Sequence, residues 1–221
     1  KGAGYKGHGG FAEVSGKLYL GFYGKANLRG TSGGRTGLLL LDPVNVTIGD
    51  GADGAEVDMT QDPVGTFTGN NPGGTAVMTI GAINAALAGT NVEILAGTLG
   101  DGFADAGNIT WSVTNATGAI VGDDLNSLTL TAHNDITFTT APNFGAWTGD
   151  FNLSAANDIT ISQVIDRTGA GGNISMFADS DAAGGGTVLI NADINTAGGI
   201  LTLDGEAIDI AGNLTAASLI A

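Results

Sequence analysis

The sequence predicts an all-β fold in which short strands stack into a parallel β-helix, or β-solenoid, of roughly nine coils. Residues 128–138 and 151–161 repeat one another 23 residues apart, and in each copy alternating apolar residues precede Asn-Asp-Ile-Thr. The alternation of Leu128 and Leu130 with Thr129 is typical of a strand with one buried face. Glycine, at 39 residues against only 4 prolines, supplies the corners between strands.

Each further element follows from similar patterns. Apolar and β-branched runs bounded by glycine predict strands at 11–15, 17–23, 25–28, 38–41, 44–48, 91–95, 108–110, 174–178, 187–190, 200–203 and 207–210. The stretch 49–74 is rich in Asp, Gly, Asn and Pro and predicts a lateral loop. In residues 79–88 the apolar side chains recur at helical spacing, which predicts one short helix that ends at Gly89 and covers a face or an end of the stack.

The predicted organisation is one continuous solenoid. Residues 1–48 form N-terminal coils with a basic end, residues 49–90 the lateral loop and the short helix, and residues 91–221 the repetitive coils. Because the sequence starts and stops within repeat-like stretches, we expect it to be a segment of a longer polypeptide.

Charge is distributed unevenly along the chain, whose net charge is −15. The first 35 residues hold six of the seven bases and one acid, Glu13, whereas the remainder holds 21 acids and one base, Arg167. This asymmetry either favours head-to-tail contact between solenoids or marks a boundary between differently evolved repeats. The acidic body argues against nucleic-acid binding, which requires clustered Lys and Arg. The lack of cysteine excludes disulfides, thiolate nucleophiles and zinc ribbons.

The N-terminal part resembles a known family. The resemblance is carried by residues 9–17 (GGFAEVSGK), 20–24 (LGFYG), 36–48 (TGLLLLDPVNVTI), the helical segment and 90–94 (TNVEI). Together they are similar to a segment of filamentous-haemagglutinin-type exoproteins of two-partner secretion systems. The resemblance covers residues 9–95, and beyond them only the repeats support it. It implies a right-handed parallel β-helix, export through an outer-membrane transporter, and an adhesive or matrix role at the outer surface of a Gram-negative-type bacterium.

The predicted function is structural. A stiff extracellular rod would mediate surface attachment, aggregation, or the assembly of a matrix, filament or biofilm. Expected partners are neighbouring repeats or copies of the chain, end to end or laterally, host or cell-surface glycans or proteins, and the transporter during export. Two alternatives stay open, a carbohydrate-active β-helix enzyme (polysaccharide lyase or hydrolase) and a module that binds glycans through Trp or Phe side chains.

We assign no catalytic residue. The acids available to an enzyme are Asp123, Asp124, Asp179, Asp181 and Asp193. Adjacent acids on one strand point to opposite faces, so Asp123 and Asp124 make a poor catalytic pair. A lyase also needs a base, and Arg167 is the one Lys or Arg after residue 35. The large aromatic side chains, Trp111 and Trp147 among them, are expected to fill the core.

Two kinds of modification or ligand site are candidates. Four oxygen-bearing side chains of the expected loop could surround calcium, the only cofactor considered: Asp50, Asp53, Glu56 and Asp58. Asn-x-Ser/Thr sequons, which are candidates for glycosylation, occur at Asn45, Asn108, Asn115, Asn152, Asn173 and Asn213. The Asn-Asp pairs at 134–135 and 157–158 have a structural explanation, since such residues bond to backbone at corners and form ladders from coil to coil.

Overall fold

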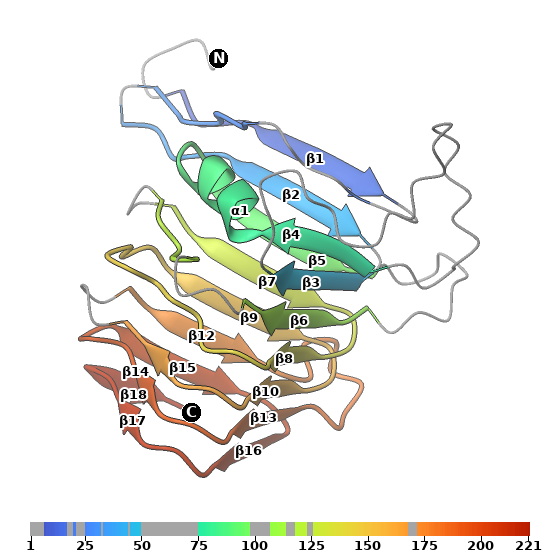
Figure 1. Ribbon diagram of the computed structural model, residues 1–221, viewed down its shortest axis with the longest axis vertical. Coiled ribbons are helices and arrows are strands. Elements are labelled where there is room, and N and C mark those ends of the chain that lie inside the picture. The colour runs from blue at the N-terminus through green and yellow to red at the C-terminus, as the bar shows by residue number, and fades with distance from the viewer. Residues whose placement is uncertain are drawn as a thin grey trace.

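The chain is built from short parallel strands and one helix in a computed structural model that describes residues 7–16, 20, 25–31, 33–43, 45–49, 75–97, 107–113, 118–122, 126–167 and 172–221. Within these residues the strands form three sheets, which we name A, B and C, and the paired strands run parallel. The first strand lies at one end of an elongated stack and the last three at the other (Figure 1). The predicted all-β class is therefore confirmed.

Sheet A follows the order of the chain. Its strands are β1 (Phe11–Gly16), β2 (Leu38–Pro43), β5 (Asn91–Ala96), β7 (Leu128–Ala132), β9 (Phe151–Ala155), β12 (Ile174–Phe177), β15 (Ile200–Asp204) and β18 (Ser218–Ile220). The register confirms the predicted repeat, because Leu128 pairs with Phe151 and Leu130 with Leu153. A slip of one residue would turn the apolar side chains outward, so the buried alternation specifies this register.

Sheet B lies beside sheet A and has the same direction of stacking. From the N-terminal end its strands are β4 (Thr75–Thr79), β3 (Asn45–Gly49), β6 (Ile109–Ser112), β8 (Ile136–Phe138), β10 (Ile159–Ile161), β13 (Thr187–Ile190) and β16 (Ala207–Ile210). Strand β4 departs from chain order because it pairs with the edge of β3 that faces away from β6. The series Ile109, Ile136 and Ile159 aligns three consecutive strands.

Sheet C forms the third side. It contains β11 (Ile165–Asp166), β14 (Ile194–Asn195) and β17 (Leu214–Thr215), and isolated bridges extend its alignment through Asn143 to Ala119. From β9 onward the chain passes through sheets A, B and C in turn, and it then pairs with the preceding strand of sheet A. We call one such passage a repeat.

The predicted helix is confirmed as α1 (Ile80–Leu87), which follows β4 and precedes β5. Its N-terminus is capped by Thr79, whose Oγ1 accepts a hydrogen bond from the backbone N–H of Ala82 at 3.1 Å. The N–H of Gly89 donates to the carbonyl of Ala86 at 2.9 Å, at the end of the helix. The four residues that create its apolar spacing are buried: Ile80, Ile83, Ala86 and Leu87.

Helix α1 takes the place that sheet C has in later repeats, between a strand of sheet B and the next strand of sheet A. The side chain of Asn84 joins this helix to the third side of the stack. Nδ2 of Asn84 donates to the carbonyl of Ala119 at 2.9 Å, and Oδ1 accepts from the N–H of Val121 at 2.8 Å. One amide side chain thus supplies the donor and the acceptor that a neighbouring strand residue would supply.

Inward-facing side chains form one core. In β7, Leu128 and Leu130 are completely buried while Thr129 is half-buried, as predicted. The middle of the core is aromatic: the rings of Trp111, Phe138 and Phe151 lie with centroids 5.5–6.2 Å apart, which confirms their assignment as core fillers. Each fully buried large apolar side chain contributes about 1.5–3 kcal/mol, so the core is the main stabilising term.

The N-terminal end differs from expectation at residues 25–28, which form no strand. The N–H of Leu28 donates to the carbonyl of Gly89 at 3.3 Å, and the carbonyl of Leu28 accepts from the N–H of Gly37 at 2.7 Å. The prediction was wrong because these bonds connect the segment to the turn after α1 and to the residue before β2, so no continuous ladder forms. The predicted strand at 17–23, apart from Leu20, and residues 50–74 of the predicted loop lie outside the described residues.

The register can be tested by disulfide formation, because the chain contains no cysteine of its own. Thr131 and Ser154 are register partners on the outer face of sheet A. Neighbouring strands lie about 4.8 Å apart, within the range that a disulfide spans, so Thr131→Cys/Ser154→Cys should cross-link on oxidation. The control pair Thr129→Cys/Ser154→Cys is offset by two residues, roughly 8 Å, and should stay reduced. Thiol titration and mass spectrometry measure both, and equal cross-linking would contradict the register.

Candidate functional surface

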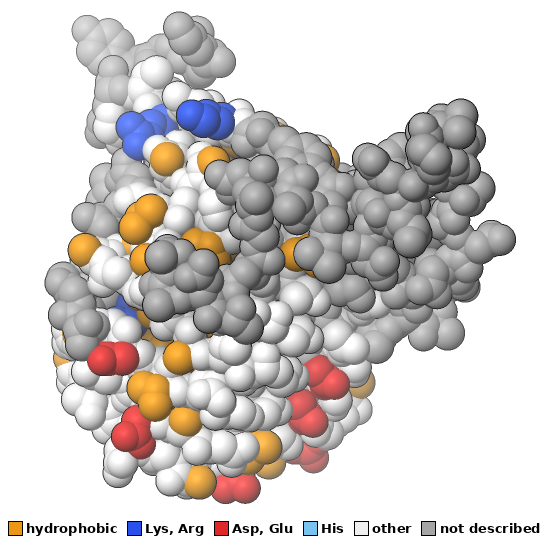
Figure 2. Space-filling view, in the orientation of Figure 1, with side chains coloured by type: hydrophobic (Ala, Val, Ile, Leu, Met, Phe, Trp, Pro, Cys, Tyr) orange, Lys and Arg blue, Asp and Glu red, His pale blue; other side chains and the backbone are white. Residues whose placement is uncertain are grey.

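The outer faces of sheets A and B carry columns of small, uncharged polar side chains. In sheet B the residues in register on consecutive strands are Thr47, Thr110, Thr137 and Thr160. In sheet A they are Thr129, Asn152, Ser175 and Thr202. All eight side chains are half-buried. Asp and Glu side chains lie around the later strands (Figure 2), whereas these eight column residues are uncharged and offer hydrogen-bonding groups to a partner.

A second column, at the corner before sheet B, bonds to the backbone of the protein itself. Oδ1 of Asn45 accepts from the backbone N–H of Asn108 at 2.9 Å, and Oδ1 of Asn108 accepts from that of Asp135 at 3.1 Å. Oδ1 of Asp135 accepts from the N–H of Asp158 at 3.1 Å, and Oδ1 of Asp158 from that of Thr187 at 2.8 Å. We call Asn45, Asn108, Asp135 and Asp158 the corner ladder. Each of its members caps the corner N–H of the next strand along sheet B.

Adjacent amides reinforce the corner ladder. Nδ2 of Asn134 donates to Oδ1 of Asn108 at 2.9 Å, and Nδ2 of Asn157 donates to Oδ1 of Asp135 at 2.7 Å. The two Asn-Asp pairs therefore form the predicted ladder, in which the Asp caps a backbone N–H and the Asn bonds to a side chain of the preceding strand's corner.

Corner side chains also cap backbone N–H groups where the strands of sheets A and C begin. Oδ1 of Asp150 accepts from the backbone and side-chain N–H groups of Asn173 at 3.2 and 3.1 Å, and Oδ1 of Asn173 accepts from the N–H of Ile200 at 2.9 Å. At sheet C, Oδ1 of Asp193 accepts from both N–H groups of Asn213 at 2.8 and 2.9 Å. These corner side chains connect one repeat to the next, which leaves fewer of their polar atoms available for an external ligand.

The sequons fall largely on these corners. Asn45, Asn108, Asn173 and Asn213 occupy corner positions, as the hydrogen bonds above show. Asn152 lies on the outer face of β9, where its Nδ2 is 3.4 Å from Oγ1 of Thr129. Asn115 lies outside the described residues. Glycosylation at these positions stays a prediction.

The candidate acids are divided between separate corners. In the turn between β12 and β13, Oδ1 of Asp179 accepts from the N–H of Gly184 at 2.8 Å and Oδ1 of Asp181 from that of Ala183 at 3.1 Å. Asp193 belongs to the corner before β14. Outside the described residues lie Asp123, Asp124 and the calcium candidates Asp50, Asp53, Glu56 and Asp58. The described residues contain no group of three or more His, Cys, Asp or Glu side chains placed to hold a metal.

Arg167 is the main feature that the sequence did not reveal. Arg167 is 1 % exposed, and its guanidinium donates to the carbonyls of Trp147, Gly149 and Asn173 at 3.0, 2.7 and 3.2 Å. Its Cζ lies 4.9 Å from the centroid of the Phe144 ring and 5.1 Å from that of Trp147. Arg167 is thus a structural cation in the core. Phe144 precedes it by 23 residues, the repeat length, and applying that period would have placed these two side chains side by side.

Burial lowers the pKa of Arg167 to about 10, while the carboxylate of Asp150 acts in the opposite direction. The side chain therefore stays charged at neutral pH, and its burial costs free energy that the carbonyls and rings offset. A base held in this way is not presented to a substrate at the surface. The two tryptophans are equally enclosed, at 0 % exposed for Trp111 and 3 % for Trp147, whereas Phe11 and Phe177 are 61 % and 37 % exposed.

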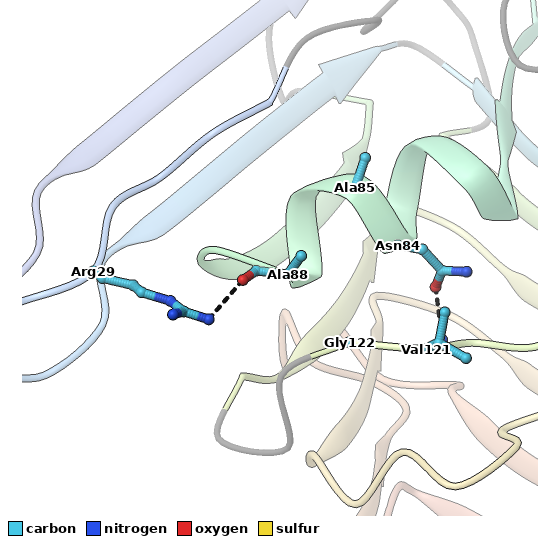
Figure 3. Close-up of a pocket in the computed structure, with 6 residues that line it drawn as sticks. All are labelled: Arg29, Asn84, Ala85, Ala88, Val121 and Gly122. Atoms are coloured by element: carbon cyan, nitrogen blue, oxygen red, sulfur yellow. Dashed lines mark hydrogen bonds between the residues drawn. The ribbon is translucent and has the colours of Figure 1, made fainter.

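An open groove lies beside α1 and is lined by Arg29, Asn84, Ala85, Ala88, Val121 and Gly122 (Figure 3). Nη2 of Arg29 donates to the carbonyl of Ala88 at 2.7 Å, at the C-terminal end of the helix where a positive charge is favourable. Asn84 is bonded to Val121 across the groove, and Val121 is 54 % exposed. The side chains of Arg29 and Asn84, the polar groups that line the groove, thus hold α1 in place.

Comparison with known proteins gives no relative: no family model, curated protein or solved structure matches this sequence. Among the described residues, no helix is both long enough and apolar enough to cross a membrane. The class that the fold and surface define is an all-β protein of stacked parallel strands, in which corner acids and amides bond to the protein itself.

The structural role of Arg167 predicts the effect of its replacement. Arg167→Met retains much of the volume but removes the guanidinium that donates to the carbonyls of Trp147 and Gly149, and it leaves the carbonyl of Asn173 with the N–H of Phe151 alone. The free energy of unfolding should therefore fall by about 2–4 kcal/mol. Arg167→Lys should lose less, because an ammonium group retains the charge. Urea denaturation measures both changes, with the exposed Arg35→Met as the control, which should change stability by less than about 0.5 kcal/mol. An Arg167→Met protein as stable as the wild type would contradict this role.

The corner ladder makes a second prediction. Asp135→Ala removes the acceptor for Nδ2 of Asn157 and for the N–H of Asp158 and should destabilise the protein by about 1–2 kcal/mol. Asp135→Asn retains Oδ1 and should lose less than half of that. Thermal unfolding followed by circular dichroism compares them with Ser162→Ala, an exposed change expected to be neutral. Equal losses for Asp135→Ala and Asp135→Asn would show that charge, and not the acceptor geometry, matters.

Proposed function

We propose that this chain is a stretch of right-handed parallel β-helix that serves as a stiff rod in a secreted or cell-surface protein of the filamentous-haemagglutinin type. The observation that carries the proposal is that, after each repeat, the chain pairs in parallel and in register with its preceding strand. A parallel crossover of this kind is right-handed in nearly all proteins. The resemblance of residues 9–95 to such exoproteins supports the same family.

Stiffness follows from contacts that recur along the stack. Each repeat bonds to the next through two or three sheets and through capped corners, and its buried columns continue from repeat to repeat. Because every repeat contacts mainly its neighbours, length adds to the rod without new kinds of contact. A rod of this kind suits projection from a cell surface.

Attachment is supported by the outer columns of Thr, Ser and Asn. Their hydroxyl and amide groups recur at the strand spacing of about 4.8 Å, which presents a regular row of donors and acceptors. Such a row suits hydroxyl-rich surfaces such as glycans and matrix polysaccharides. This function requires a location outside the cell or on its outer surface, which in a Gram-negative-type bacterium is reached by export through an outer-membrane transporter. A cysteine-free chain is compatible with such export.

The proposal is tested with beads coated with the chain. We expect them to be retained under flow on cellulose, chitin or mucin layers more strongly than albumin-coated beads. In Thr137→Arg/Thr160→Arg, bulky charges interrupt the threonine column of sheet B, and retention should fall at least about fivefold, because many weak contacts act together.

The matched control is Ser180→Arg/Ala183→Arg, which places the same charges on exposed residues of the turn between β12 and β13 and should retain adhesion. Thermal unfolding checks that both variants are folded. Retention no better than albumin on all three layers would refute the adhesive role. Release of reducing sugar ends by the chain would favour the enzyme alternative instead.

A further inference from the structure

A large aromatic ring stands on the outer face of sheet A, within the stack. Phe177 is the last residue of β12, faces outward and is 37 % exposed. Strands β9 and β15 pair with β12 on either side and place Ser154 and Asp204 in register with Phe177. Because β12 has a neighbour on each side, this exposure does not arise from an edge of the sheet. Covering the ring would recover part of the roughly 1.5–3 kcal/mol that full burial contributes, so the ring favours a ligand.

Polar side chains surround this ring on three consecutive strands. Ser175 lies two residues before Phe177 on the same face of β12, and its register partners are Asn152 and Thr202. We call the following six residues the Phe177 platform: Asn152, Ser154, Ser175, Phe177, Thr202 and Asp204. Among the residues that the structure describes, none bonds to the hydroxyls of Ser154, Ser175 and Thr202 or to the carboxylate of Asp204. These groups therefore differ from the corner acids, which bond to the protein itself.

The composition of the Phe177 platform fits a sugar ring. An aromatic ring offers a flat apolar face, on which the C–H face of a sugar packs with its hydroxyl groups at the rim. The neighbouring strands lie about 4.8 Å to either side, so their polar side chains reach the rim of a sugar that covers Phe177. The serine and threonine hydroxyls donate and accept hydrogen bonds, whereas the carboxylate of Asp204 only accepts. The site thus suits a sugar that places a strong donor beside Asp204.

The charge around the platform indicates which sugar this is. Residues 168–221 contain six acids and neither Lys nor Arg, and Figure 2 shows Asp and Glu side chains around the later strands. This field attracts cations and repels the carboxylates and sulfates of acidic polysaccharides. Asp204 faces outward like Phe177, so a further strand would lie beside it and not over it. An ammonium group on the stacked sugar would therefore meet the carboxylate of Asp204 close to the aromatic ring.

We propose that the Phe177 platform binds a cationic amino sugar within a polysaccharide chain, such as glucosamine. The sugar ring stacks on Phe177, its ammonium group bonds to Asp204, and its hydroxyls bond to the hydroxyls of the platform. The inference rests on the proposed adhesive function and deepens it, because it names a discrete site on sheet A and the class of glycan that the site selects.

Isothermal titration calorimetry with soluble oligomers of equal length tests this selection. At mildly acidic pH, where sugar amines are protonated, the wild type should bind a glucosamine hexamer at least about tenfold more tightly than an N-acetylglucosamine hexamer, because acetylation removes the charge that pairs with Asp204. A galacturonate hexamer should not bind measurably, since its carboxylates meet an acidic surface. Equal affinity for the free and the acetylated hexamer would overturn the proposal, as would no binding of the glucosamine hexamer.

Variants of the ring separate stacking from general attraction. Phe177→Ala leaves the charge of the protein unchanged and should weaken binding of the glucosamine hexamer at least about tenfold. Phe177→Trp should retain binding, and its exposed indole should change in emission when the hexamer is added. The emission of the wild type should stay constant, because Trp111 and Trp147 are buried. Thermal unfolding checks that each variant is folded.

The carboxylate is tested with matched controls. Asp204→Asn should weaken binding of the glucosamine hexamer at least about fivefold, because the ammonium group loses its charged partner. Asp209→Asn removes an exposed acid from sheet B, and Phe11→Ala removes an exposed phenyl ring from β1. Both controls should bind like the wild type. A loss at Asp209→Asn equal to that at Asp204→Asn would show that net charge, and not the platform, governs binding.

A lysine hexamer separates the site from the field of the whole surface. It has as many ammonium groups as the glucosamine hexamer but no sugar ring, so it should bind more weakly and respond little to Phe177→Ala. The proposal is overturned if the two hexamers bind equally, or if Phe177→Ala binds glucosamine like the wild type. The bead assay separates the two ideas, because beads retained on cellulose or mucin without glucosamine binding would leave the proposed function standing.

Discussion

The structure depends on one constraint: each repeat must pair in parallel and in register with its neighbour. The register of Leu128 with Phe151 places one apolar column over the next, and the same alignment places Thr over Asn on the outer face. Because the side-chain period of a strand is two, any odd shift would bury the threonines and expose the leucines. The core, the outer columns and the corners all follow from keeping this register.

The corners solve the problem that such stacking creates. Where a strand begins, its first backbone N–H lies next to a bend of the preceding strand and has no carbonyl opposite it in the ladder. In the corner ladder an Asn or Asp oxygen takes the place of that carbonyl, and residues such as Asp150 and Asp193 do the same at the other sheets. The composition follows from this requirement, because Asn and Asp are rich in acceptors and tolerate bends. Several acids of the repeats thereby bond to the backbone of the protein itself.

Arg167 and Asn84 show how the stack is completed where it is not regular. Near Arg167 the third side consists of isolated bridges and a turn, and the guanidinium donates to the carbonyls of Trp147 and Gly149. It also donates to the carbonyl of Asn173, which accepts from the N–H of Phe151 as well. Beside α1 the amide of Asn84 acts in place of a missing strand. Both are single polar side chains that replace backbone pairing.

The sequence by itself determined most strands of sheets A and B, the helix at 80–87, the buried alternation and the corner role of the Asn-Asp pairs, because period two, helical spacing and turn chemistry are local properties. It did not indicate β4, β18 or the two-residue strands of sheet C. It also located the basic and acidic parts of the chain. Only the tertiary structure decided that the buried Arg167 donates to three backbone carbonyls, that Asn84 bonds to Ala119 and Val121, and that residues 25–28 form no strand. These outcomes depend on which groups are left unpaired once distant segments meet, and no local pattern carries that information.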